Sequence, residues 1–196
     1  MKKVINVILT LLIIAAIVVI GLIVYNYVVS EKNDSNLAKV VTEIEQQFSN
    51  NTGNTNSVEP VKVQYNGFDV VGLIEIPSIN IKYPIINKTN DTTMKYSITK
   101  FSGGEINSIG NFTVAGHNNL NGTMFGKVKR LKIGDQIKLT DLYNNTVTYE
   151  IFDIYSVDPN DVSCLDSVEE NTKEVTLITC TNGHLKRLIT KAREVV

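Results

Sequence analysis

Residues 174–187 read "EVTLITCTNGHLKR", a strand-like run that contains a cysteine near its end. The run up to Cys180 is rich in Val, Ile, Leu and Thr, which is typical of a buried β-strand, and a Gly-containing turn follows it. A cysteine at such a position usually packs as a small hydrophobic residue. The rest of the chain must therefore show whether Cys180 is chemically active.

Short strand-like segments recur from Phe68 to the carboxyl end. They are "VVGLIEIP", "INIKYPII", "NFTVAGH", "DQIKLTDL", "TVTYEIFDIYSV", "EVTLITC" and "LKRLITKARE". Turn residues separate them, and short helical turns such as "DTTMKYSITK" fit between them. Many strands without alternating long helices predict a mostly β, mostly antiparallel domain, either a closed barrel or a sandwich.

The amino end predicts a membrane anchor. Residues 4–29 carry no charged side chain, and at ~1.5 Å per residue a helix of this length exceeds the ~30 Å hydrocarbon core of a bilayer. The stretch is longer than a signal-peptide core and ends in bulky residues, with Tyr25 and Tyr27 at the expected outer interface. Lys2 and Lys3 predict a cytoplasmic tail at residues 1–3, with the rest of the chain outside the cell.

Residues 30–67 are polar and Asn-rich, and we expect them to form a linker that contains a short amphipathic helix. The apolar residues at helical spacing are Leu37, Val40, Val41, Ile44 and Phe48. The sequence then predicts a globular β domain at residues 68–196, which the chemistry below would make the catalytic domain.

Composition excludes several classes of function. A formal net charge of -1 with scattered basic residues gives no footprint for nucleic acid. Two cysteines are too few for a disulfide scaffold, and no Cys/His cluster has zinc-site spacing. We expect no cofactor and no metal, although Glu105 and neighbouring loops leave calcium dependence open.

Three residues near predicted strand ends form a chemically coherent set: His117, Cys180 and Arg187. A thiolate can attack a carbonyl carbon, an imidazole can protonate the departing amine, and a guanidinium can stabilise the oxyanion. This combination suits acyl transfer.

The motifs "TLITC", "VAGHNN" and "KRLITKARE" together resemble those of the sortase family, the membrane-anchored cysteine transpeptidases of Gram-positive bacteria. The resemblance covers about residues 70–195. It implies a closed eight-stranded β-barrel preceded by one transmembrane helix in the cell membrane, with the catalytic domain extracellular. The loop of six residues, 181–186, looks most like class D, with class A next.

The resemblance also implies roles. Cys180 becomes the nucleophile, His117 the general acid and base, and Arg187 the stabiliser of the oxyanion, while Thr179 contributes hydrogen bonds to substrate. The implied reaction cleaves an LPxTG-type sorting signal between Thr and Gly. A thioacyl enzyme forms and is resolved by an amine of peptidoglycan precursor or by a pilin lysine.

Rivals exist for each role: His184 for the acid, Arg193 or Arg130 for the guanidinium, and Cys164 for the thiol. A Cys164–Cys180 disulfide would inactivate the nucleophile. Two other functions stay open, a membrane-anchored extracytoplasmic binding or scaffold domain and a hydrolytic cysteine peptidase.

Overall fold

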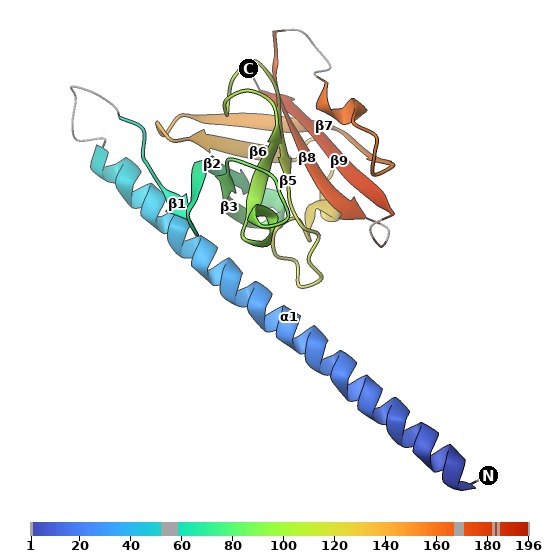
Figure 1. The fold of residues 1–196 in the computed structure, drawn as a ribbon. Coiled ribbons are helices and arrows are strands. Elements are labelled where there is room, and N and C mark those ends of the chain that lie inside the picture. The colour runs from blue at the N-terminus through green and yellow to red at the C-terminus, as the bar shows by residue number, and fades with distance from the viewer. Residues whose placement is uncertain (1, 52–58, 167–170, 182, 184, 196) are drawn as a thin grey trace.

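A computed structural model describes residues 2–51, 59–166, 171–181, 183 and 185–195, and consists of one long helix beside a β-barrel (Figure 1). The helix is α1 (Lys2–Asn51). The strands are β1 (Gln64–Tyr65), β2 (Phe68–Ile76), β3 (Ile81–Ile86), β4 (Ile98–Ser102), β5 (Gly110–Ala115), β6 (Gln136–Asp141), β7 (Thr146–Val157), β8 (Lys173–Thr181) and β9 (Lys186–Glu194). Short 3-10 helices lie at η1 (Pro77–Ile79), η2 (Thr93–Lys95), η3 (Val128–Arg130) and η4 (Ser163–Leu165).

Eight strands close into a barrel, as the resemblance to sortases implies, and β4 is a strand that the sequence pattern did not predict. They follow the order β2-β3-β4-β5-β8-β9-β7-β6, and β6 pairs with β2 to complete the ring. Most neighbours are antiparallel, but β3–β4 and β5–β8 are parallel. The closed ring excludes the sandwich alternative and leaves only the short β1 paired outside it, on β2.

Alternating side chains of the strands fill the barrel. Ile74, Ile85, Leu139 and Leu177 are each completely buried, and Tyr149 is buried with them. Its phenol donates a hydrogen bond to Asn107 Oδ1 at 2.9 Å. Each buried aliphatic side chain stabilises the fold by roughly 1.5–3 kcal/mol relative to an exposed one. The core therefore fixes the register of the strands that carry the candidate site.

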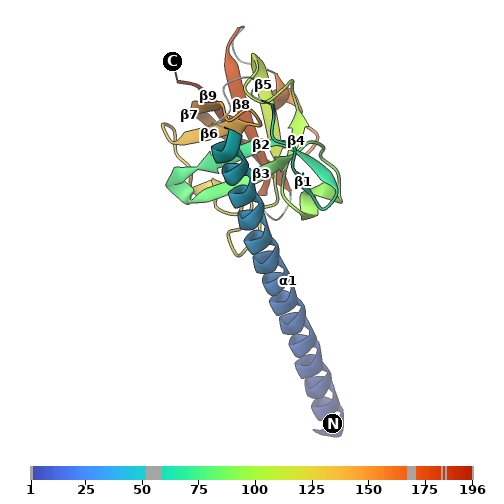
Figure 2. The same cartoon turned by 90° about the vertical axis from the view of Figure 1, so that its left-hand side faces the viewer.

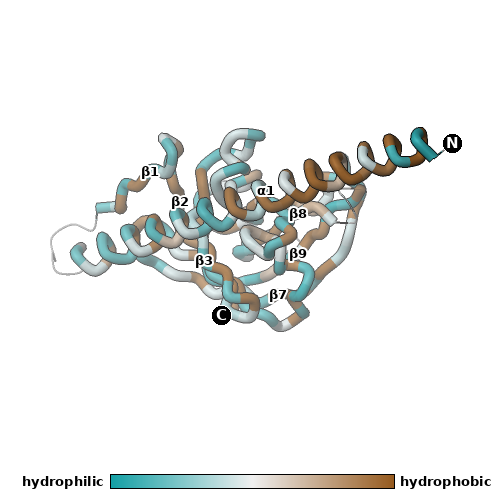
Figure 3. The backbone as a smooth tube through the Cα atoms, turned by 90° about the horizontal axis from the view of Figure 1, so that it is seen from below, coloured by the Kyte–Doolittle hydropathy of each residue, from teal (hydrophilic) through white to brown (hydrophobic). Residues whose placement is uncertain are grey.

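The first half of α1 is apolar and projects away from the barrel (Figures 1 and 3). All large hydrophobic side chains within residues 4–29 are exposed. Among the described residues, α1 is the one helix long and apolar enough to cross a membrane. This geometry is consistent with the predicted anchor.

The second half of α1 differs from the polar linker expected at residues 30–67. The helix continues without a break to Asn51, and its apolar stripe packs against β3 and joins the main core (Figure 2). Leu37 and Ile44 are completely buried. Val61 and Val63 are buried too, ahead of the expected domain start. An amphipathic helix buries its apolar side chains against another surface, and β3 provides that surface for the five apolar residues of this stripe.

Polar contacts reinforce this docking. Lys82 on β3 forms an ion pair with Glu45 on α1 at 2.6 Å. The Tyr83 phenol donates a hydrogen bond to Asp34 and accepts one from the Met124 backbone N–H at 3.1 Å. Burial, together with the Asp34 carboxylate, raises the pKa of Tyr83, so the phenol keeps its proton as a donor. The docked half of α1 is therefore tied to the barrel by apolar and polar contacts.

We predict that Ile44→Ala lowers the free energy of unfolding by about 2–5 kcal/mol, because it leaves a cavity between α1 and β3. Lys39→Ala, on the exposed face of the same helix, is the matched control and should change little. The measurement is denaturant unfolding of the full chain in detergent, followed by circular dichroism. Equal effects of the two substitutions would show that α1 adds nothing to the core.

Candidate active site

Cys180 lies one residue before the end of β8 and directly opposite Arg187 on β9. The two strands are antiparallel, and directly opposed residues project their side chains to the same face. The Cys180 side chain is partly exposed, so a reactant can reach it. The hairpin thus places Cys180 and Arg187 next to each other at one end of the barrel, where the Arg187 guanidinium donates to the Lys186 carbonyl at 3.5 Å.

His117 reaches the same place from β5. The parallel β5–β8 ladder ends with Ala115 opposite Ile178, and the Gly116 N–H donates to the Ile178 carbonyl at 3.1 Å. The backbone of His117 then turns away from β8, because its carbonyl accepts the N–H of Phe125 at 2.9 Å. The residues that flank His117 are both bonded to the end of β8.

The first of these flanking bonds involves Thr179. Its hydroxyl donates to the Gly116 carbonyl at 2.7 Å. The second involves Asn118, whose side-chain amide donates to the Cys180 carbonyl at 2.8 Å. Together they hold the segment that contains His117 against the end of β8, while Arg187 lies on the neighbouring strand at the other edge of β8.

The buried position of Thr179 bears on its expected contact with substrate. The side chain is 3% exposed and its hydroxyl is already engaged with Gly116. Its geometry is that of a positioning residue that joins β8 to the segment carrying His117.

Two further positions complete the local architecture. A Cβ on Gly116 would lie 2.8 Å from the ring of Phe125, which is completely buried, so glycine lets the chain pass close to this ring. Asn118 is a residue of the candidate site that the sequence analysis missed. The signal was present in "AGHNN", but a contact between residues 62 positions apart becomes visible only when β5 and β8 pair.

Two of the rival residues, Cys164 and Arg193, lie away from Cys180. Cys164, in η4, is 2% exposed, and burial raises the pKa of its thiol. Cys164 and Cys180 are both free thiols, so no disulfide joins them. Arg193 lies 3.8 Å from the Glu174 carboxylate, toward the far end of the β8–β9 hairpin. Arg130 belongs to η3, and His184 falls outside the described residues.

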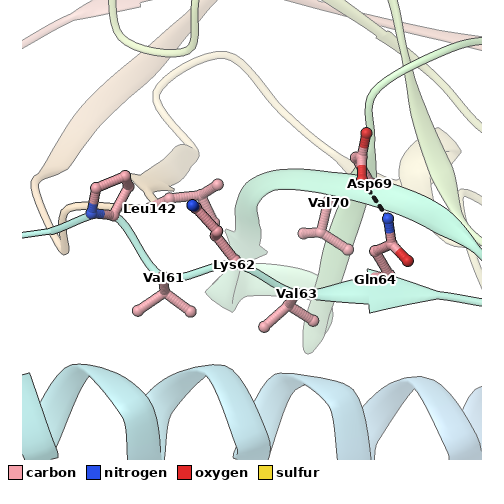
Figure 4. Close-up of a pocket in the computed structure, with 8 residues that line it drawn as sticks. Val61, Lys62, Val63, Gln64, Asp69, Val70 and Leu142 are labelled. Atoms are coloured by element: carbon pink, nitrogen blue, oxygen red, sulfur yellow. Dashed lines mark hydrogen bonds between the residues drawn. The ribbon is translucent and has the colours of Figure 1, made fainter.

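No three His, Cys, Asp or Glu side chains in the described part of the chain are grouped so that they could hold a metal ion. A pocket between the segment 60–64 and β2 is lined by Pro60, Val61, Lys62, Val63, Gln64, Asp69, Val70 and Leu142 (Figure 4). None of the candidate catalytic residues lines this pocket. The site at the end of β8 is therefore separate from it.

A protein-family model described as a sortase domain matches residues 74–195, which include His117, Cys180 and Arg187. The chain belongs to the sortase family. Its match begins within β2 and runs through β9, so it covers nearly all of the closed barrel of this sortase.

Named relatives agree with this assignment. The sortase is 34% identical over 119 residues to Sortase A of Listeria monocytogenes, covering 59% of this chain and 51% of that protein. It is 29% identical over 110 residues to Sortase D of Bacillus subtilis, covering 56% of this chain and 53% of that protein. The sortase thus matches about half the length of these curated relatives.

A solved structure also matches the fold. The structure of a Clostridium perfringens Sortase D5 transpeptidase is similar with a TM-score of 0.62 and 26% identity, covering 86% of this chain and 99% of that one. The family of the chain and its eight-stranded barrel therefore rest on sequence and on structure.

Proposed function

We propose that this sortase is a membrane-anchored cysteine transpeptidase. In the proposed reaction it cleaves an LPxTG-type sorting signal between Thr and Gly and transfers the new carboxyl end to an amine. The observation that carries the proposal is that two segments meet at Cys180. Arg187 lies opposite Cys180 in the β8–β9 pair. The segment containing His117 is hydrogen-bonded to the end of β8 through Thr179 and Asn118.

In the first half-reaction the Cys180 thiolate attacks the carbonyl carbon of the scissile bond. The oxygen takes up negative charge, which the neighbouring Arg187 guanidinium stabilises. The imidazolium of His117 gives its proton to the nitrogen as the C–N bond breaks. The amine product leaves, and the acyl group remains on sulfur as a thioester.

The second half-reaction runs the same chemistry in reverse with a new nucleophile. An incoming amine attacks the thioester carbonyl, and His117 takes the proton that the amine loses. The C–S bond breaks, the thiolate returns, and an amide is released. We propose an amine of peptidoglycan precursor or a pilin lysine as the acceptor, on the outer side of the cell membrane.

The proposed subclass is D, with A next. The loop between Cys180 and Arg187 is short, and the chain is similar both to the Clostridium perfringens Sortase D5 transpeptidase and to Sortase A of Listeria monocytogenes. These features support the proposal, while the sorting motif itself is a matter for experiment.

The direct test of the function is mass spectrometry of the full chain in detergent with a library of LPxTG-type peptides. We expect a thioacyl adduct on Cys180 that disappears when an amine is added, with formation of the amide. Cys180→Ala should form no adduct, whereas Cys164→Ala, which changes a buried thiol away from the site, should still form it. A scaffold protein would give no adduct, and a peptidase would release only the free acid even with excess amine.

The assignment of the acid predicts different results for the two histidines. His117→Ala should slow peptide cleavage by about 10²–10⁴-fold, the range typical of general acid–base groups. His184→Ala should reduce the rate only several-fold. The assay is cleavage of a fluorogenic LPxTG-type peptide, after circular dichroism has shown that both variants are folded. An inactive His184 variant beside an active His117 variant would reverse the assignment.

A further inference from the structure

The loop that begins with His117 (residues 117–126, the His117 loop) contacts α1 where the apolar part of the helix ends. Ser30 Oγ lies 2.8 Å from Thr123 Oγ1. The Asn119 side-chain amide donates to the same Ser30 oxygen at 3.4 Å and to Thr123 Oγ1 at 2.9 Å. Figures 1 and 2 both show this loop beside the helix.

Ser30 marks the level of a membrane surface along α1. It follows Val29, the last residue of the uncharged apolar stretch, and Glu31 and Lys32 come next. Tyr25 and Tyr27 are exposed in the preceding turns. Tyrosine is enriched at membrane–water interfaces, where its ring and its hydroxyl are both accommodated. A bilayer that holds residues 4–29 would therefore have its headgroup layer at about Ser30.

The tip of the His117 loop carries Leu120, whose side chain is fully exposed. A single exposed leucine is ordinary on a protein surface. Here, however, Asn119 on one side and Thr123 on the other are both held at Ser30. These contacts keep Leu120 near the level of Ser30, where the headgroup layer of a bilayer that holds residues 4–29 would lie.

The same end of the barrel carries the candidate site. Because β5 and β8 are parallel neighbours, the segments that follow them emerge at the same end. The His117 loop follows β5, while Cys180 and the exposed Leu185 lie at and beyond the end of β8. Ile109 precedes β5 and is also exposed, but it lies at the opposite end of that strand.

We infer that the His117 loop rests on the phospholipid bilayer with Leu120 in its interfacial layer, so that the Cys180 end of the barrel faces the membrane. The inference rests on the membrane anchor of the proposed function. It deepens that function, because a site facing the bilayer receives acyl donors whose cleavage sequence lies close to the membrane surface.

Tryptophan fluorescence tests this orientation, because the chain contains no natural tryptophan. Leu120→Trp and the matched control Ile109→Trp are each reconstituted as full chains into phosphatidylcholine–phosphatidylglycerol vesicles. Each is measured with ordinary and with acyl-brominated lipid. We expect blue-shifted emission and several-fold stronger quenching by brominated lipid for Leu120→Trp than for Ile109→Trp.

Flotation first shows that the vesicles carry the protein. If the two variants in these vesicles then give equal emission and equal quenching, the inference is overturned. Failure of the chain to float with the vesicles would overturn it as well, because it would show that residues 4–29 do not anchor the chain in a bilayer. Cleavage of a soluble LPxTG-type peptide in detergent is measured in parallel with the unsubstituted chain. Absence of cleavage there would refute the proposed catalysis separately from the orientation.

Discussion

The parallel pairing of β5 with β8 is the constraint on which the candidate site depends. It joins two strands that are separated in sequence by β6 and β7, and it sets Ala115 opposite Ile178. From that register the chain after β5 emerges beside the end of β8. Hydrogen bonds from Thr179 to Gly116 and from Asn118 to Cys180 then hold the residues on either side of His117 against β8. Antiparallel pairing with β9 brings Arg187 to the other side of Cys180.

Helix α1 connects this arrangement to the proposed membrane. Its docked half shares the hydrophobic core with β3, and Tyr83 on β3 is bonded both to Asp34 of the helix and to the backbone of Met124 in the His117 loop. Ser30 contacts the same loop directly. Helix, barrel and loop therefore form one continuous packed unit, in which the direction of the anchor also sets the direction of the site.

The sequence predicted every barrel strand except β4 because the strand signals are local. Runs of Val, Ile and Thr mark strands, and turns separate them. The start of β4 lies in "DTTMKYSITK", which indicated a short helix or turn instead. The strand pattern alone left a sandwich open, and the closed barrel was implied by the resemblance to sortases. The docking of residues 30–51 was not predicted, because a stripe such as Leu37 and Ile44 indicates an amphipathic helix without naming its partner surface. The uncharged anchor also gave no sign that its helix would continue to Asn51.

Within the site, residue types were predictable and contacts were not. A thiol, an imidazole and a guanidinium suggested acyl transfer from their chemistry alone. The inward direction of the Thr179 hydroxyl and the bond from Asn118 to the Cys180 carbonyl depend on a strand more than 60 residues away in sequence. Such contacts depend on which strands pair in the barrel, and the spacing of motifs along the sequence does not reveal strand pairing.

Disulfide trapping measures directly whether β5–β8 pairing holds residue 117 beside Cys180. A disulfide forms readily only between residues whose Cα atoms lie about 4.4–6.8 Å apart. In a Cys164→Ala background, His117→Cys is exposed to a mild oxidant and its remaining free thiols are titrated, with Ile109→Cys as the control. We expect rapid loss of both thiols through an intramolecular bond to Cys180 in the His117→Cys protein alone. Persistence of both thiols in that protein, or equal bonding in the control, would contradict it.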